Sequence, residues 1–315
     1  MEISAKMVSE LREKTGAGMM KCKEALKVCN CSMEEAVDYL RKKGLASADG
    51  KADRKASQGL VTLMVSGDKR AASILEVNCE TDFVAKNDNF VAFAKTLGEI
   101  QLNNKNIQSP ADLAAQKTKD GQPVDEVRKL LISKINENMV IGRTDRLEIA
   151  AGHHGIIDMY VHGDKEITKT GKVGDHQFGV GAIGVLIAVE ATNPDAVKHD
   201  DLHTFAHEVA LQACAMKARF LSRDQIATDV LNREKDVILG QIKEDPKNAS
   251  KPESVLAKIV EGRLDKFFKE RCLLEQVYVK DDTKTIKDLM ADVAKKMGGE
   301  VKITTFRRWA LGEQV

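Results

Sequence analysis

Two segments of the chain repeat the same order of apolar and polar positions. Each reads as an apolar strand, a Gly-Asp turn, a second apolar strand and a helix, which is typical of an antiparallel pair covered by a helix. The first strands and turns align at an offset of 96, where Gly59, Gly67, Asp68 and Lys69 match Gly155, Gly163, Asp164 and Lys165. The second strands and helices align at an offset of 112, where Val77, Asp88, Phe93 and Ala94 match Val189, Asp200, Phe205 and Ala206. The second copy therefore contains a 16-residue insertion near Glu166 to Gly181.

The residues before the first copy have the spacing of a small helical module. Apolar periodicity predicts three helices within residues 1–44, with a capping box at Ser32 and Glu35 and with Gly44 as the end of the third helix. Residues 45–58 have little periodicity, so we expect a mobile linker there. The first copy continues into a further helix with apolar positions from Val124 to Ile135, and we place core subdomain one at 59–150.

A helical hairpin interrupts the second copy at residues 222–270. Two narrow apolar stripes flank a short turn that contains proline, which is typical of antiparallel helices. A capping box is predicted at Ser222 and Gln225, and Asp245-Pro246 is predicted to stop the first helix of the hairpin.

The remaining pattern completes core subdomain two, which we place at 151–221 and 271–315. It predicts a strand at 273–279, a helix from Ile286 to Met297 and a last strand at 301–309. The predicted fold class is α+β: a three-helix N-terminal module, a core of two repeated antiparallel-sheet-plus-helix subdomains, and an inserted antiparallel helical hairpin.

Composition and charge narrow the classes of function. The formal net charge is +1, so a nucleic acid is not the expected partner. No apolar run approaches the ~20 residues that span a bilayer, so no membrane partner is expected. The first residues have neither the apolar core of a signal peptide nor the Arg/Ser bias of a transit peptide. Scattered cysteines indicate reduced thiols and a cytoplasmic protein: Cys22, Cys29, Cys31, Cys79, Cys214 and Cys272.

The most informative stretch is the strand-to-helix corner that runs from Val77 to Asn87. The apolar strand pattern ends there and helical spacing begins, with Thr81 or Asp82 placed to cap the new helix. The offset of 112 aligns Thr81, Asp82 and Phe83 with Asn193, Pro194 and Asp195. Since the second copy turns this corner without an aromatic residue, folding does not require Phe83, which becomes a candidate for binding. The alternative is that Phe83 packs beneath its own helix, as buried phenylalanines commonly do.

Two stretches resemble the signatures of the elongation factor Ts family. One is Val77-Asn78-Cys79-Glu80-Thr81-Asp82-Phe83-Val84-Ala85-Lys86-Asn87, and the other is Leu11-Arg12-Glu13-Lys14-Thr15-Gly16-Ala17-Gly18-Met19-Met20. The resemblance implies a guanine-nucleotide exchange factor that acts on the GTPase elongation factor Tu in translation elongation. Such a factor breaks no bond and needs no cofactor or metal. The resemblance further implies that the N-terminal module is ubiquitin-associated-like.

The resemblance also implies roles for individual residues. Thr81, Asp82, Phe83 and Val84 would dislocate Mg²⁺ from the partner GTPase, with Phe83 as a wedge and with Thr81 and Val84 shaping the corner. Leu11, Met19 and Met20 would contact the partner, although core packing is an equally good interpretation for at least one of the two methionines. The hairpin at 222–270 would protrude and serve homodimerisation or partner contact.

The sequence departs from the family pattern in two places. The second copy carries the insertion near 166–181, and the chain stops at Gly312-Glu313-Gln314-Val315, whereas longer members continue into a further C-terminal helical module that contacts the GTPase. The contact made by that module is therefore in doubt for this chain.

Other signals keep two alternatives open. His199, His203 and His207 recur at helical spacing, which would suit a metal-dependent enzyme, although successive turns rarely converge on one ion and a solvated helix face is the simpler interpretation. Arg307-Arg308 followed by Trp309 could stack a base in an RNA-binding adaptor, although the outer face of a last strand is the simpler interpretation. Cys29 and Cys31 lack a second cysteine pair at metal spacing.

Overall fold

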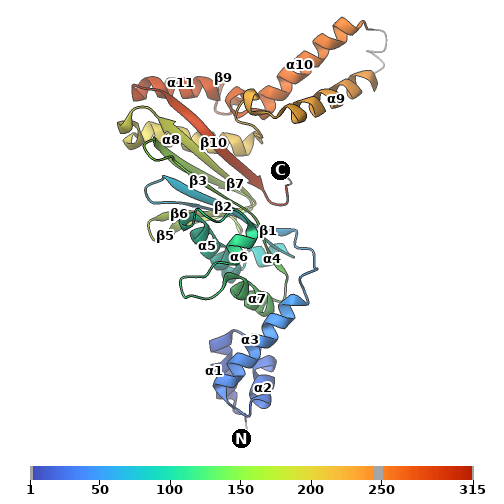
Figure 1. The fold of residues 1–315 in the computed structure, drawn as a ribbon, viewed down its shortest axis with the longest axis vertical. Coiled ribbons are helices and arrows are strands. Elements are labelled where there is room, and N and C mark those ends of the chain that lie inside the picture. The colour runs from blue at the N-terminus through green and yellow to red at the C-terminus, as the bar shows by residue number, and fades with distance from the viewer. Residues whose placement is uncertain (1–2, 245–250, 314–315) are drawn as a thin grey trace.

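The N-terminal helical module lies at one end of the long axis of the molecule, and the helical hairpin lies at the other (Figure 1). The computed structural model describes residues 3–244 and 251–313. The module consists of α1 (Ala5–Thr15), α2 (Met19–Val28) and α3 (Met33–Asp49). Its small core is aliphatic and sulfur-rich, with Val8, Leu11, Cys22, Leu26 and Leu40 among its buried members. Ser32 accepts a hydrogen bond from the Glu35 backbone N–H, which is one half of the predicted capping box.

The prediction that Gly44 ends the third helix is wrong, because α3 continues through it to Asp49. Gly44 lies where α3 crosses α7 (Val124–Ile135), and a Cβ atom there would be 3.2 Å from the Ser133 hydroxyl. The glycine therefore serves close helix packing rather than helix termination. Ion pairs fasten the same crossing: Arg41 pairs with Glu126, and Lys129 Nζ lies 2.8 Å from Asp49 Oδ1.

Two antiparallel sheets form the core. The first has the strand order β3-β2-β1-β6-β5 and the second has the order β10-β7-β4. Their bounds are β1 (Gln58–Val65), β2 (Ala71–Cys79), β3 (Met139–Glu148), β4 (His154–His162), β5 (Lys169–Val173), β6 (His176–Gly181), β7 (Ile183–Ala191) and β10 (Val301–Ala310). Strand β3 was not predicted.

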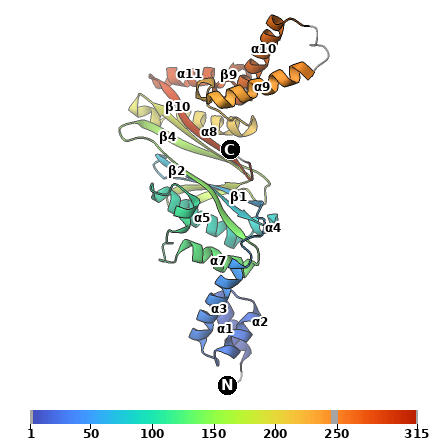
Figure 2. The ribbon, with the colours of Figure 1, turned by 45° about the vertical axis from the view of Figure 1, so that its right-hand side comes forward.

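The sheets pack on each other and carry helices on their outer faces (Figures 1 and 2). Along β1, Leu60 and Met64 join the cluster beneath the helices, while Val61, Leu63 and Val65 join the cluster between the sheets. Because both faces of the strand are covered, its apolar run is continuous instead of alternating. The outer helices are α4 (Asp82–Ala85), α5 (Asp88–Asn103), α6 (Pro110–Ala114), α7, α8 (Asp200–Ala215) and α11 (Ile286–Met297), with the short helix η1 (Pro194–Lys198) before α8.

The predicted repeat corresponds to matching strands and helices. Strands β1 and β2, followed by α4 and α5, match β4 and β7, followed by η1 and α8. The matched glycines occupy equivalent crowded places: a Cβ at Gly59 would lie 2.0 Å from the Val77 carbonyl oxygen, and one at Gly155 would lie 2.6 Å from the Val189 carbonyl oxygen. Only a residue without a Cβ fits so close to the neighbouring strand.

The insertion of the second copy belongs structurally to the first sheet. It forms the hairpin β5–β6, and β6 pairs with β1 so that Val61 opposes Gly181 and Val65 opposes Gln177. Phe178 and Val180 are buried in the cluster beneath the helices of the first copy. Lys95 lies over the Phe178 ring, with Nζ 4.5 Å from the ring centroid. The insertion of the second copy therefore completes the core of the first copy.

The predicted hairpin at 222–270 contains α9 (Thr228–Glu244) and α10 (Glu253–Arg271). Ile238, Ile242 and Leu264 are buried between them. The capping box predicted at Ser222 is wrong, since Ser222 precedes the short helix η2 (Arg223–Gln225) without a side-chain cap. The stop predicted at Asp245-Pro246 lies outside the described residues.

Apolar side chains remain exposed on the outside of this hairpin, among them Val237, Leu239 and Val255. Nothing in the structure covers them, and homodimerisation through 222–270 stays a prediction. The strand predicted at 273–279 is mostly replaced by η4 (Leu273–Glu275) and the short β8 (Val277–Tyr278), which pairs with β9 (Asp281–Thr285). Within the described ranges, no helix combines the length and apolar character that a membrane span requires.

The place of the insertion in the core predicts a large stability effect. Phe178→Ala removes a buried aromatic side chain and should lower the free energy of unfolding by about 3–5 kcal/mol. Urea unfolding measures this quantity. Lys172→Ala, on an exposed position of β5, is the matched control and should change it by less than about 0.5 kcal/mol. Equal stability of the two variants would show that β6 is not part of this core.

Candidate functional site

The corner between β2 and α4 begins with a side-chain cap. Thr81 has extended backbone angles (φ −125°, ψ 158°), and its hydroxyl accepts a hydrogen bond from the Val84 N–H at 3.4 Å. Of the two predicted capping candidates, Thr81 is therefore the N-cap, and Asp82 occupies the first turn of α4. A carboxylate in this position is favoured by the free N–H groups of the helix start.

Two carboxylates fasten the corner to the turn between α7 and β3. Glu137 accepts hydrogen bonds from the Thr81 N–H at 3.0 Å and from the Thr81 hydroxyl at 2.7 Å. In return, Glu80 accepts from the Asn138 N–H at 2.6 Å. We call these reciprocal contacts the corner latch. Charge-assisted hydrogen bonds of this kind are stronger than neutral ones, so the backbone of the corner is held before any partner arrives.

The corner latch also holds the chain that leads out of the N-terminal module. The Asn138 side-chain amide is buried and donates to the carbonyl oxygens of Ala52 at 3.1 Å and Arg54 at 2.7 Å. Arg54 lies 3.6 Å from Glu80. The segment expected to be a mobile linker thus begins as the end of α3 and continues as a hydrogen-bonded connection beside the corner.

Phe83 points away from the protein interior, with 78% of its surface exposed. The next residue, Val84, is only 7% exposed and packs in the cluster beneath the helices with Ala85. The alternative in which Phe83 packs under its own helix is therefore wrong. A large apolar side chain left in water on a fixed corner is typical of a contact site for a partner.

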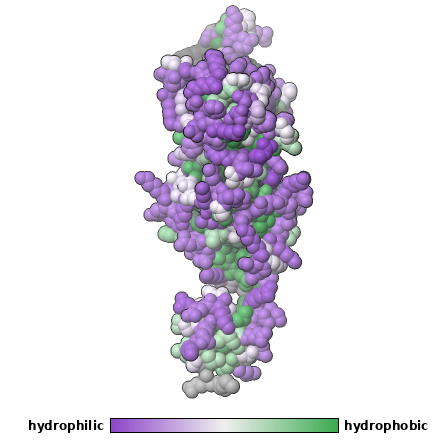
Figure 3. All heavy atoms as spheres, turned by 90° about the vertical axis from the view of Figure 1, so that its left-hand side faces the viewer, coloured by the Kyte–Doolittle hydropathy of each residue, from purple (hydrophilic) through white to green (hydrophobic). Residues whose placement is uncertain are grey.

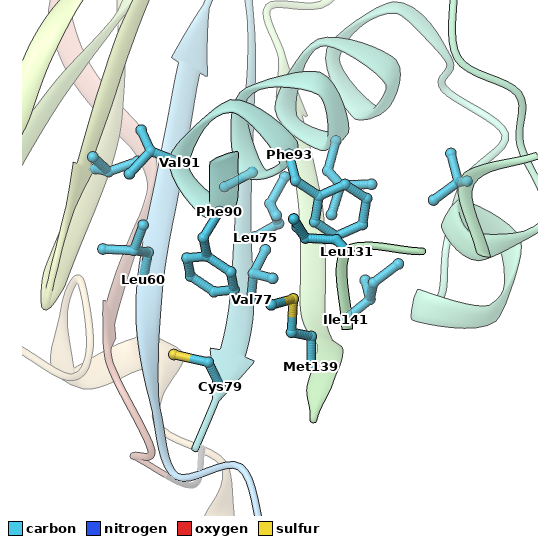
Figure 4. Close-up of a cluster of buried hydrophobic side chains, with 14 of the residues drawn as sticks. Leu60, Leu75, Val77, Cys79, Phe90, Val91, Phe93, Leu131, Met139 and Ile141 are labelled. Carbon is cyan, nitrogen blue, oxygen red and sulfur yellow. The ribbon is translucent and has the colours of Figure 1, made fainter. Parts of the chain in front are cut away.

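Cys79 forms the inner side of the corner. Figure 4 shows it on β2 at the end of the cluster that contains Val77 and Phe90. Its Sγ lies 3.1 Å from the Thr81 carbonyl oxygen, and burial raises the pKa of the thiol to about 12. Such a thiol stays protonated and unreactive at neutral pH, so Cys79 contributes packing rather than chemistry.

Asp82 presents an exposed carboxylate next to one lysine. Lys86 Nζ lies 3.7 Å from Asp82 Oδ2 and 2.7 Å from Glu166 Oε2. The hydrogen bond that Lys86 donates to the Glu166 carboxylate is the main cause of the raised pKa of Lys86. The corner thus offers an exposed aromatic ring and an exposed carboxylate side by side.

The second group of candidate residues divides between surface and core. Met19 and Met20, in the first turn of α2, are 59% and 77% exposed, so neither packs in the module. Leu11 is 0% exposed, so its side chain cannot make the direct partner contact that the resemblance implied. It supports α2 from inside the module instead.

The exposed residues of the two groups share one side of the molecule. Figures 1 and 2 both place α2 and α4 on the same side of the long axis. Figure 3 shows the opposite face, where hydrophilic residues cover most of the upper part and apolar residues show around the middle and on the N-terminal module. Helices α2 and α4 are therefore approached from the same side of the molecule.

The histidines of the possible metal site have other neighbours. His203 Nδ1 lies 3.2 Å from Lys69 Nζ, and His207 Nδ1 lies 3.9 Å from Asp158 Oδ1. Nowhere in the described part of the chain do three His, Cys, Asp or Glu side chains gather as they would around a metal ion. The structure therefore offers no support for a metal-dependent enzyme at this stripe.

The residues that suggested base stacking are also engaged within the protein. Trp309 is 7% exposed and lies under the Arg143 guanidinium, whose Cζ is 4.7 Å from the ring centroid. Arg307 Nε lies 2.6 Å from Asp145, and Arg308 lies 2.7 Å from Glu313. No free aromatic platform is left at this position.

Sequence reasoning missed the two residues of the corner latch outside the corner, Glu137 and Asn138. They reach Thr81 and Glu80 because β3 pairs with β2 and places Met139 opposite Cys79. The sequence signal for this contact is the end of the predicted helix at 124–135, because the chain that leaves the helix passes along the free edge of β2. Lys86 lies within the signature, but the sequence assigns it no role. Glu166 marks only the start of the insertion in the sequence.

Comparisons with known proteins identify the family of the chain. The sequence model of the family described as Elongation factor TS matches residues 80–313. The chain is 40% identical to elongation factor Ts of Clostridium perfringens strain SM101, over 99% of this chain and 94% of that protein. It is 38% identical to elongation factor Ts of Symbiobacterium thermophilum, over 100% of this chain and 93% of that protein. It is 37% identical to that of Nostoc punctiforme, over 100% and 94% respectively. The chain therefore belongs to the elongation factor Ts family.

Proposed function

We propose that this protein is the guanine-nucleotide exchange factor for elongation factor Tu in translation elongation, and that it acts in the cytoplasm. It would bind the GDP form of the GTPase, displace Mg²⁺ and promote release of GDP so that GTP can bind. The observation that carries the proposal is the exposure of Phe83, 78%, on a corner that the latch holds fixed. Family membership supports the same function.

Phe83 would act as an apolar wedge between elements of the GTPase. Burying a phenylalanine side chain contributes roughly 1.5–3 kcal/mol. Because Thr81 and Glu137 already fix the backbone, little conformational entropy is lost when the ring is buried in the partner. That free energy is then available to displace the GTPase elements around the nucleotide.

Asp82 would act on the same elements by hydrogen bonding. Its exposed carboxylate can accept from N–H groups at a helix start or from side-chain donors in the partner. Mg²⁺ bridges the phosphates of a bound nucleotide and the loops of the GTPase, so a shift of those loops removes ligands from the metal. Loss of the metal weakens nucleotide binding because the phosphate charges are no longer neutralised.

Exchange of this kind requires no bond chemistry in the factor. The exchange protein weakens the binding of the nucleotide to the GTPase, and the nucleotide weakens the binding of the exchange protein. Thermodynamic linkage requires that the two affinities fall by the same ratio. GDP release is therefore accelerated by binding alone, without a catalytic group or a cofactor of the exchange factor.

The other candidate residues would support this contact. Met19 and Met20 would form a second apolar contact with the GTPase, since flexible thioether side chains adapt to varied surfaces. Thr81 and Val84 would act indirectly, Thr81 through the corner latch and Val84 through its burial, which holds α4 against the core.

The first prediction concerns Asp82→Ala and Phe83→Ala. Each variant should slow GDP release from elongation factor Tu by about tenfold or more, because about 1.4 kcal/mol corresponds to a factor of ten. Stopped-flow fluorescence with a labelled GDP measures the rate. Neither variant should lower the free energy of unfolding noticeably, since both side chains are exposed.

The second copy of the repeat provides the matched control. Asp195 occupies the place that corresponds to Phe83, and Asp195→Ala should leave the exchange rate unchanged. Wild-type acceleration by both Asp82→Ala and Phe83→Ala would contradict the wedge mechanism.

The second prediction concerns the corner latch. Glu137→Gln weakens two charge-assisted hydrogen bonds and should lower stability by about 1–2 kcal/mol. The exchange rate at saturating factor should also fall, because the corner is no longer pre-organised. Thr81→Ser retains the hydroxyl and should keep most of the activity. If Glu137→Gln lost stability but exchanged nucleotide at the wild-type rate, pre-organisation of the corner would not matter.

A further inference from the structure

The insertion of the second copy begins beside the corner of the first copy. The segment that leads from β4 into β5 forms a tight turn in which the Ile167 and Thr168 N–H groups donate to the Asp164 carbonyl oxygen at 3.0 and 2.8 Å. The Glu166 N–H donates to the Asp164 carboxylate at 2.9 Å. These bonds fix the backbone at Glu166, so its side chain is presented from a defined position.

Glu166 and Asp82 approach the same ammonium group. Lys86 Nζ is within hydrogen-bond distance of Glu166 Oε2, at 2.7 Å, but is 3.7 Å from Asp82 Oδ2. Lysine and aspartate four residues apart on a helix attract each other, so without Glu166 the ammonium group of Lys86 would form its closest ion pair with Asp82. Lys86 thus bridges both carboxylates, with a hydrogen bond to Glu166 on the insertion and a longer ion pair to Asp82.

We propose that Glu166 is a positioning residue, which takes the hydrogen bond of Lys86, keeps the Lys86–Asp82 ion pair at 3.7 Å and so leaves the Asp82 oxygens open to hydrogen bonds from the partner GTPase. The inference rests on the proposed function and gives the insertion a role in it. A partner that approached an Asp82–Lys86 ion pair would first have to break it. With Lys86 hydrogen-bonded to Glu166, the ion pair that the partner has to break is long, and the cost of breaking it is smaller.

The same strip contains a natural control. Lys169, three residues after Glu166, pairs with Asp88 at 3.1 Å, so it too ties the insertion to the start of α5. This pair has the same kind of exposed geometry but does not involve Asp82 or Lys86. It separates a general bracing effect of the insertion from the specific effect on Asp82.

The test compares GDP release from elongation factor Tu at subsaturating factor for five variants, one of which is Asp82→Ala as the reference background. Glu166→Gln keeps the shape of the side chain and removes its charge, and it should slow exchange by about twofold to fivefold, in line with the strength of exposed ion pairs. Adding Lys86→Gln to this variant should restore the wild-type rate, because no cation is left to cover Asp82. Lys169→Gln should exchange at the wild-type rate, and Glu166→Gln should have no further effect in an Asp82→Ala background.

Three outcomes would overturn the inference. If Glu166→Gln exchanges at the wild-type rate while Asp82→Ala is slow, the positioning role is wrong and the proposed function stands. If Lys86→Gln deepens the defect of Glu166→Gln, the pair is a structural brace. If Asp82→Ala itself exchanges at the wild-type rate, both the inference and the proposed mechanism fail. Thermal unfolding of each variant checks that the fold is retained.

Discussion

The reciprocal contact between two turns is the constraint on which the candidate site depends. Glu137 holds the Thr81 backbone and hydroxyl, and Glu80 holds the Asn138 N–H in return. Without these bonds, the short helix α4 would have only one side-chain cap to define its start. Because the latch joins the end of β2 to the start of β3, the corner moves only if the first sheet moves. Because the backbone of the corner is fixed, the exposed aromatic ring keeps its position when it contacts a partner.

The same turn connects the corner to the chain that leaves the N-terminal module. Asn138 binds the chain that leaves α3, and the crossing of α3 and α7 is fastened by the ion pairs around Gly44. The N-terminal module is therefore oriented by contacts near the corner. The insertion of the second copy reaches the corner from the other direction through Glu166 and Lys169. Two segments far apart in sequence thus converge on α4.

The sequence predicted the repeat, the module, the hairpin and the corner, because each depends on local periodicity or on comparison of two copies. It could not predict what depends on long-range pairing. Strand β3 escaped notice because its half-buried residues include Arg143, Asp145 and Arg146, which bond to partners elsewhere in the fold. The sequence predicted Gly44 as a helix end because the close crossing of α3 with α7 is a contact between residues distant in sequence. Comparison of the copies did single out Phe83, since a residue that the second corner lacks is not needed for folding.

If the factor displaces Mg²⁺, the effect of its corner on GDP release depends on the metal. GDP release from elongation factor Tu would be followed with wild-type factor and with Asp82→Ala, with free Mg²⁺ present and with the metal chelated. If the corner acts by removing the metal, the difference between the two proteins should be large with Mg²⁺ and should shrink when the metal is already gone. A difference of the same size under both conditions would contradict the account.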